Sequence, residues 1–297
     1  MTSPFDQYLN TNYAPSDSEV KKIQVHLVPH SLEAARLEAL IRDLSDQREK
    51  TLAYIDAHQA LISPARRLPR DIVQEIFLAC LPSHRNTVMS ATEAPLILAR
   101  ICSAWRTIAL STPALWASLH LPLEYIFDHS LHAPVTKWLG RSGRCPLSLS
   151  IIGSQNLDQW EDCDPGGVDA VVDELVRSSD RWDRVELSFD SEEGLLRLAQ
   201  VYAPKLVAVK IRCDVSEILR MKLLTTPSLR EVSLLIARAF DRFIPQLPLR
   251  WDYLTHISFD STGMYHMEGL SPNVAIHVLN RCPRLVRFKS DVNNNTE

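Results

Sequence analysis

A six-residue pattern recurs along the second half of this chain: a leucine or tryptophan, followed by apolar residues three and five positions later. It fits the segments RWDRVEL, KLVAVKI, SLREVSL and YLTHISF, and it fits RLVRFKS less well. The first positions of these segments are 24, 23, 25 and 31 residues apart. Alternation of period two is typical of a β-strand with one buried face. Amphipathic segments such as VDAVVDELVRSS and NVAIHVLNRC precede most of them, so the pattern predicts repeated helix–strand units.

Helix–strand units at this spacing are typical of a solenoid similar to leucine-rich repeats. The asparagine of the usual repeat is missing, with Asp214 and Ala237 at equivalent positions, so we expect irregular units. The segment KWLGRSGRCPLSLSII has the features of a divergent first unit, whose helix ends near Gly143. We therefore assign residues 122–297 to an irregular α/β solenoid with a parallel sheet. Its strands should direct one row of side chains into a continuous core: Val185, Val209, Val232, Ile257 and Phe288.

The side chains that alternate with this core row should share the opposite face of the sheet. Basic residues outnumber acidic residues there, although the whole chain carries a formal charge of −4. This local reversal favours an acidic or phosphorylated partner, while a solvated sheet face of mixed charge is an equally good alternative. The candidate binding residues on this face are Arg184, Glu186, Lys210, Arg212, Glu231, His256, Arg287 and Lys289.

Three helices are predicted within residues 64–121: two strongly apolar ones, and a third that starts at Pro113 with Thr112 as its candidate cap. In LPRDIVQEIFLACLP, apolar residues repeat at i, i+1, i+4 and i+5, which gives a stripe that is wide for so short a helix. In TEAPLILARICSAWRTIAL, Thr92 is the candidate N-cap, and Ile101 and Trp105 share one face. A module of this size cannot bury so much apolar surface internally. We therefore expect the first helix to contact a partner protein, with Trp105 and Trp116 belonging mainly to the core.

The N-terminal part of the chain divides into two segments. Residues 1–30 mix Pro, Ser, Asn and Asp with few spaced apolar positions, which indicates a flexible segment. Residues 31–63 are rich in Leu, Ala, Glu and Arg and predict an amphipathic helix. We expect this helix to lie against the next domain. A short coiled coil is the alternative, although Arg48 and Thr51 interrupt the apolar stripe.

Composition and motifs argue against several classes of function. The small net charge indicates no clustered basic face for nucleic acid, and no window approaches the ~20 apolar residues of a membrane span. No secretory signal is recognisable, so we expect a cytoplasmic or nuclear protein. Six dispersed cysteines without a C-x-x-C pair indicate free thiols. Phosphate-binding, nucleophile-elbow and metal-ligand motifs are missing, so we predict no catalytic residue, cofactor or metal site, and an enzyme is the minority interpretation.

The run RRLPRDIVQEIFLACLP … ICSAWRTIALSTPALWASL resembles an F-box. The resemblance rests on the Leu-Pro start, the I-V-Q-E-I-F helix, the C-S-A-W-R turn and the terminal P-A-L-W, and it extends from Arg66 to about Leu119. The preceding helix and the later WLGRSGRCPLSLSI are similar to a large group of fungal F-box proteins. In that group an N-terminal helix, an F-box and a degenerate leucine-rich-repeat-like region follow in this order. The resemblance is close in the first half of the chain and loose in the second.

This resemblance implies that residues 64–121 dock on the Skp adaptor, which joins a cullin–RING scaffold in an SCF-type ubiquitin ligase. Residues 122–297 would then hold an unidentified protein substrate for ubiquitin transfer, without doing chemistry themselves. The outward face of the sheet becomes the substrate surface. The expected adaptor-binding residues are Leu68, Pro69, Ile72, Val73, Ile76, Phe77, Leu81, Pro82, Ile101 and Trp105.

Two other functions stay open beside this one. An adaptor-bound scaffold that never engages the cullin would be a non-catalytic interaction protein, and co-purification of the cullin separates it from a ligase subunit. An enzyme would need a deep cleft lined by titratable residues with shifted pKa values.

Overall fold

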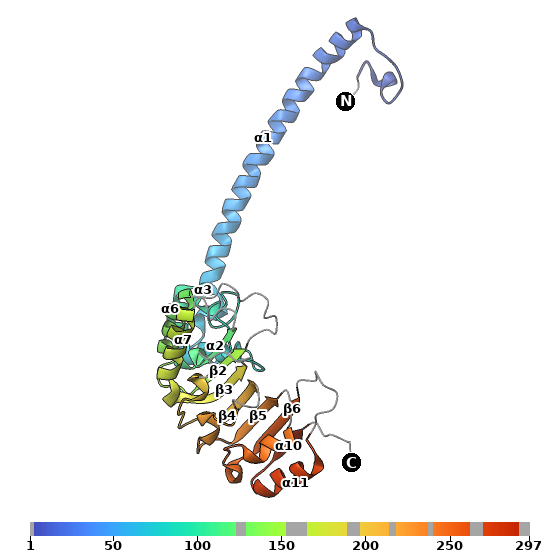
Figure 1. The fold of residues 1–297 in the computed structure, drawn as a ribbon. Helices are drawn as coiled ribbons and strands as arrows, with labels where there is room; N and C mark the ends of the chain where they lie inside the picture. Colours follow the sequence, from blue (N-terminus) through green and yellow to red (C-terminus); the bar gives the residue numbers. More distant parts are fainter. Residues whose placement is uncertain are drawn as a thin grey trace. The chain divides into compact units, whose positions relative to one another are not determined.

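The structure is a computed structural model, and it divides the chain into two compact units, Met1–Leu68 and Pro69–Glu297 (Figure 1). The residues described are 3–122, 129–152, 165–188, 197–213, 218–236, 240–261 and 270–290.

The first unit consists mainly of α1, which spans Asp17–Ile62. The helix begins at a capping signal, because the Glu19 carboxylate accepts hydrogen bonds from the Ser16 N–H at 2.9 Å and from Ser16 Oγ at 2.7 Å. The helix therefore begins at Asp17, not near the expected Ser31, and includes part of the segment for which flexibility was expected. No residue of α1 is buried. Among the described residues, no helix combines the length and the apolar character needed to cross a membrane.

The second unit begins with a helical module, defined here as residues 69–117. Its helices are α2 (Arg70–Ala79), α3 (Leu98–Ile101), α4 (Ser103–Leu110) and the 3₁₀ helix η3 (Pro113–Trp116). The sequence predicted one helix from Thr92 onward, but the helix is interrupted at Cys102, whose backbone is extended (φ −157°, ψ 170°). Cys102 Sγ accepts a hydrogen bond from the Trp105 N–H at 3.4 Å and thereby caps α4. Edge-to-face packing of Phe77 and Trp105, with ring centroids 5.0 Å apart, joins α2 to α4.

A sheet of seven parallel strands follows, and its strands are neighbours in chain order from β1 to β7. The five segments that fit the sequence pattern form β3 to β7, and the divergent first unit supplies β2. The remaining strand, β1, was not predicted. The strands are β1 (Ser118–Pro122), β2 (Leu147–Ile152), β3 (Trp182–Ser188), β4 (Ala208–Cys213), β5 (Glu231–Ile236), β6 (His256–Ser261) and β7 (Arg287–Ser290).

Helices of the connecting segments lie beside the sheet (Figure 1). The connection between β1 and β2 contains α6, which ends at Arg141. Gly143 follows shortly after with a φ of 58°, a backbone conformation that glycine adopts easily and that ends helices. The helices are α6 (His132–Arg141), α7 (Pro165–Arg177), α10 (Phe240–Phe243) and α11 (Pro272–Arg281), with 3₁₀ turns η4 (His129–Leu131), η6 (Ser179–Arg181), η7 (Lys222–Thr225), η8 (Ile244–Gln246) and η9 (Trp251–Tyr253).

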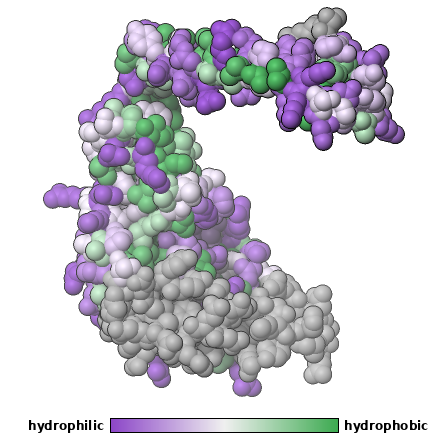
Figure 2. Space-filling model, turned by 90° about the horizontal axis from the view of Figure 1, so that it is seen from above, coloured by the Kyte–Doolittle hydropathy of each residue, from purple (hydrophilic) through white to green (hydrophobic). Residues whose placement is uncertain are grey.

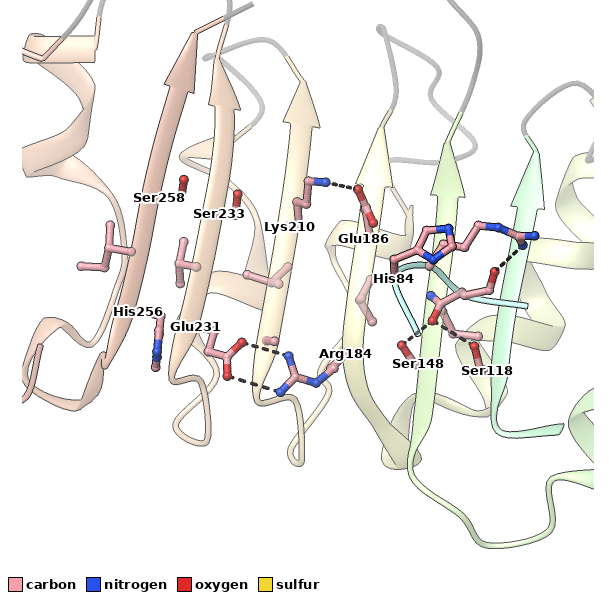
Figure 3. Close-up of a pocket in the computed structure, with 18 of the residues that line it drawn as sticks. His84, Ser118, Ser148, Arg184, Glu186, Lys210, Glu231, Ser233, His256 and Ser258 are labelled. Carbon is pink, nitrogen blue, oxygen red and sulfur yellow. Dashed lines mark hydrogen bonds and ion pairs between the residues drawn. The ribbon is translucent and has the colours of Figure 1, made fainter. Parts of the chain in front are cut away.

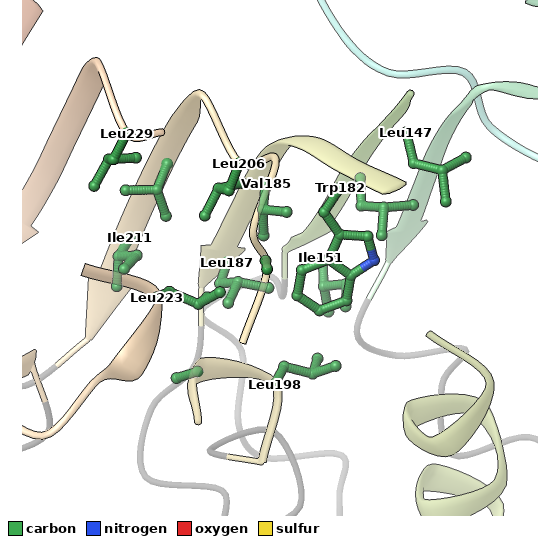
Figure 4. Packing of buried hydrophobic residues seen from close by; sticks show 14 of the residues in the cluster. Leu147, Ile151, Trp182, Val185, Leu187, Leu198, Leu206, Ile211, Leu223 and Leu229 are labelled. Atoms are coloured by element: carbon green, nitrogen blue, oxygen red, sulfur yellow. The ribbon is translucent and has the colours of Figure 1, made fainter. Parts of the chain in front are cut away.

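The strand register confirms the predicted core row. Val185, Val209, Val232, Ile257 and Phe288 are direct partners across successive strands. The first four are 2–3% exposed, and Phe288 packs against the same core as a partly buried residue. The leading positions of the first four pattern segments are also buried: Trp182 begins β3, and Leu206, Leu229 and Leu254 each lie two residues before β4, β5 and β6. Figure 4 shows Trp182, Leu206 and Leu229 in this cluster. The opposite face of the sheet is therefore free to present polar side chains.

Candidate interaction surfaces

The helical module leaves part of its apolar surface uncovered. In α2, Val73 and Phe77 point into the core, whereas Ile72 and Ile76 are 44% and 40% exposed. Residues four apart lie on the same side of a helix, so the two isoleucines share one exposed strip. Ile101, at the end of α3, is 56% exposed. Burying large apolar side chains is the usual source of affinity in a protein interface, so these residues are candidates for a partner contact.

Two of the predicted adaptor-binding residues lie inside the module and not on its surface. Val73 and Phe77 are 2% and 0% exposed, because they form the side of α2 that packs inside the module, where Phe77 meets Trp105. Their side chains are not accessible to a partner. The other predicted residues are exposed or half-buried: Leu68, Pro69, Ile72, Ile76, Leu81, Pro82, Ile101 and Trp105.

The sequence also contained an apolar candidate that was missed. Ile97 is exposed and lies four residues before Ile101, within the turn that leads into α3. This i, i+4 spacing was the signal that could have identified it. The exposed isoleucines of the helical module are thus Ile72, Ile76, Ile97 and Ile101.

A groove of about 790 Å³ lies over the outward face of the sheet (Figure 3). Arg212, on β4, occupies the next outward position beyond Lys210 and does not line it. The serines Ser118, Ser148, Ser233 and Ser258 line it too; they sit at outward strand positions that period-two alternation could have identified. The predicted residues that line the groove are Arg184, Glu186, Lys210, Glu231, His256, Arg287 and Lys289.

An ion pair crosses the row of outward residues nearest the start of the strands. In this row Ala208 lies between Arg184 and Glu231, each on an adjacent strand. Because the alanine side chain is short, the Arg184 guanidinium passes over it and donates two hydrogen bonds to the Glu231 carboxylate, at 2.9 and 3.3 Å. This hydrogen bonding raises the pKa of Arg184. The pair fixes both side chains across three strands.

The next outward rows carry two further ion pairs. Lys210 pairs with Glu186 on the neighbouring strand. Lys289 on β7 donates to Asp260 on β6 at 2.8 Å, and Ser258 Oγ donates to the same carboxylate at 2.8 Å. Partial burial acts to raise the pKa of Asp260, but the hydrogen bonds from Lys289 and Ser258 outweigh it and lower the pKa below its usual value.

The charge of the groove is positive, but most of it is internally compensated. Five Lys or Arg and two Glu side chains line the groove, and most of the basic ones have a carboxylate partner. Within the described part of the chain, Arg212 and Arg287 have no carboxylate at ion-pair distance. Exposed ion pairs contribute only about 0–1 kcal/mol each, so a carboxylate or phosphate of a partner can replace an internal carboxylate at small cost.

One wall of the groove comes from the helical module. Residues 83–86, in the loop after α2, line the groove beside β1 and β2. Asn86 Oδ1 accepts hydrogen bonds from Ser118 Oγ at 3.0 Å and from Ser148 Oγ at 2.7 Å. Val88 forms a parallel bridge with His120, whose N–H donates to the Thr87 carbonyl at 2.7 Å.

Comparisons with family models, with curated proteins and with solved structures found no match for this chain. Within the described ranges, no three His, Cys, Asp or Glu side chains are grouped closely enough to hold a metal ion. The features of the described residues that bear on function are therefore the exposed isoleucines of the helical module and the groove over the sheet.

Proposed function

We propose that this chain is the substrate-receptor subunit of an SCF-type cullin–RING ubiquitin ligase. The helical module docks on the Skp adaptor, and the groove over the sheet holds a protein substrate. The observation that carries this proposal is the presence of two different surfaces on one compact unit: uncovered isoleucines on the module and a polar groove on the sheet. Such a receptor acts by holding its substrate near the conjugating enzyme, which raises the effective concentration of the reacting groups.

The adaptor-docking role is supported by the F-box resemblance together with the exposure of Ile72 and Ile76. The resemblance rests on segments with a matching local structure. The Leu-Pro start directly precedes α2, and the first helix of the motif is α2 itself. The C-S-A-W-R turn coincides with the interruption between α3 and α4 at Cys102. An apolar strip on a rigid helix is a suitable surface for a permanent partner, because little conformational entropy is lost when it is covered.

We further infer that the α/β part is an irregular leucine-rich-repeat-like solenoid. Parallel strands in chain order and a core row that passes through every repeat support this inference. The outward face of such a sheet is an extended surface on which successive repeats contribute neighbouring side chains. Its side chains in the groove are mainly serines and paired charges, which suits polar recognition of an acidic segment of the substrate.

Affinity purification of the full chain followed by mass spectrometry tests the function. Recovery of the Skp adaptor, a cullin and a third protein that accumulates when the proteasome is inhibited supports the ligase subunit. Recovery of the adaptor without any cullin supports an adaptor-bound scaffold. Recovery of neither partner rejects both functions.

Reversing charge on the sheet face should abolish substrate capture. We expect the triple variant Lys210→Glu, Arg212→Glu and Arg287→Glu to lose the substrate while binding the adaptor at wild-type strength, because the adaptor contacts lie on the helical module. A matched control reverses Lys137, Lys222 and Arg242, three exposed basic residues of connecting helices that do not line the groove. The measurement is the ratio of substrate to adaptor in each pull-down. Equal ratios for the wild type and the triple variant of the sheet face would reject this face as the substrate surface.

A further inference from the structure

We propose that α1 pairs with α1 of a second copy of this chain, so that the protein is a dimer joined by a two-stranded coiled coil. This inference concerns the first unit only and does not rest on the proposed function. It starts from an apolar row on α1 in which no side chain is buried. The N-terminal segment approaches only the beginning of this row, where Phe5 and Tyr8 line a pocket with Leu27 and His30.

The row follows the spacing of a coiled coil. Positions separated alternately by three and four residues run from Leu27 to Ile62, and seven of these eleven positions are apolar. The sequence from Ser31 alone indicated a short and interrupted stripe, whereas the observed start of α1 at Asp17 adds a further heptad to it. The row comprises Leu27, His30, Ala34, Leu37, Ile41, Leu44, Arg48, Thr51, Ile55, His58 and Ile62, and it is called the seam below.

The apolar side chains of the seam are open to solvent. The most exposed are Ile41 at 63% and Ile62 at 75%, and Ile55 at 41% is the least exposed of the leucines and isoleucines in the row. Figure 2 shows hydrophobic residues, in green, at the surface of the chain among hydrophilic ones, in purple. A soluble chain rarely exposes a continuous apolar row of this length unless another molecule covers it.

The dimensions of the seam match those of a stable dimer. At 1.5 Å per residue, the helix between Leu27 and Ile62 is about 54 Å long. With a contact width of about 10 Å on each helix, two copies would bury roughly 1,100 Å² in total, which exceeds the ~1,000 Å² expected of a specific interface.

A second copy is the occupant that this row fits, because a row of period 3.5 is complementary to itself. In a symmetric dimer each patch faces the same patch on its partner, and knobs at the seam positions enter the matching holes. Pro29 lies off the seam, on the outer side of α1, so the hydrogen bond that it removes is not in the contact. The polar residues Arg48 and Thr51, at neighbouring positions of the seam, lower the stability of the dimer. They also fix how the two helices align, because a shifted alignment would place them against leucine or isoleucine.

The test is the mass of the full chain by sedimentation equilibrium at about 5–100 µM, across the range in which a micromolar dimer forms. We expect two chains of 33.7 kDa per particle. The variant Ile41→Asp with Leu44→Asp should weaken the dimer by at least about a hundredfold, because truncating each interface anchor typically costs about thirtyfold. Ile41→Ala with Leu44→Ala retains high helix propensity and should also weaken the dimer, which separates loss of contact from loss of helix.

The matched control is Val25→Asp with Leu32→Asp. These residues are on α1 and are 72% and 67% exposed, but they lie opposite the seam, so the dimer should persist. A wild-type chain that sediments as a single copy or as more than two copies would overturn the proposal. So would a control variant that dissociates as readily as the seam variant. Neither result bears on adaptor capture, which is measured separately.

Discussion

The double variant Ile72→Glu with Ile76→Glu is expected to lower the affinity for the Skp adaptor by at least about a hundredfold, since each buried anchor typically contributes ~2 kcal/mol or more. Both side chains are exposed in this chain, so the module should stay folded while its apolar strip becomes charged. Two carboxylates facing an apolar partner surface would also lose their hydration without gaining a partner. Calorimetric titration with purified adaptor gives the affinity, and a thermal melt checks the fold.

A matched control for this variant is Ile276→Glu. Ile276 is 56% exposed and lies on α11, which has ten residues like α2, but it is remote from the helical module in the sequence. This control should bind the adaptor like the wild type. Leu68→Ala with Pro69→Ala, at the start of the same motif, should weaken binding in the same direction. Wild-type affinity in the Ile72/Ile76 variant would show that the module uses another surface.

Trp116→Ala is expected to lower the free energy of unfolding of the second unit by ~3–5 kcal/mol, the usual cost of removing a large buried aromatic side chain. Trp116 is fully buried between the helical module and the first connecting helix, where its ring packs edge to face on Trp138 with centroids 4.8 Å apart. Its indole N–H donates to the Ala109 carbonyl at 2.8 Å, so the variant also removes this buried hydrogen bond and leaves the carbonyl only the longer bond from the Thr112 N–H at 3.4 Å. Urea denaturation followed by circular dichroism measures the loss.

Trp116→Phe separates the two contributions. The phenyl ring retains part of the packing but removes the indole donor, so we expect a loss of about 1–3 kcal/mol. Trp105→Ala is a second comparison: because Trp105 is only half-buried, its loss should be smaller than that of Trp116. A Trp116→Ala variant as stable as the wild type would contradict the role assigned to this contact.

The strands were predictable because alternation of period two maps directly onto the two faces of a sheet. Val209 and Lys210, for example, were assigned to opposite faces from the sequence, and the structure has one buried and the other exposed. The ion pair between Arg184 and Glu231 was not predictable in the same way. It joins residues 47 positions apart, and it depends on the register that places the short side chain of Ala208 between them.

The helices were less predictable from the sequence because their boundaries and buried faces depend on a few local residues that can be interpreted in more than one way. The apolar stripe of α2 is so wide that periodicity could not tell the buried Phe77 from the exposed Ile76. The start of α1 was present in the sequence as the Ser16–Glu19 pair, but the surrounding Pro and Asn residues favoured a flexible segment. The break at Cys102 is accompanied by a local cap from the Cys102 sulfur, and cysteine is not among the residues that usually mark an N-cap in a sequence.

The contact between residues 86–88 and β1 has a consequence for how the protein can be handled. Parallel strands expose unpaired backbone groups along the first edge of a sheet, and such an edge recruits strands from other molecules. Here Thr87 and Val88 occupy part of that edge by pairing with His120. A fragment prepared without the helical module would uncover β1, whose side chains alternate between buried and half-buried. Aggregation by strand addition is the expected fate of such a fragment, so a soluble fragment containing the sheet should retain the chain from Pro69 onward.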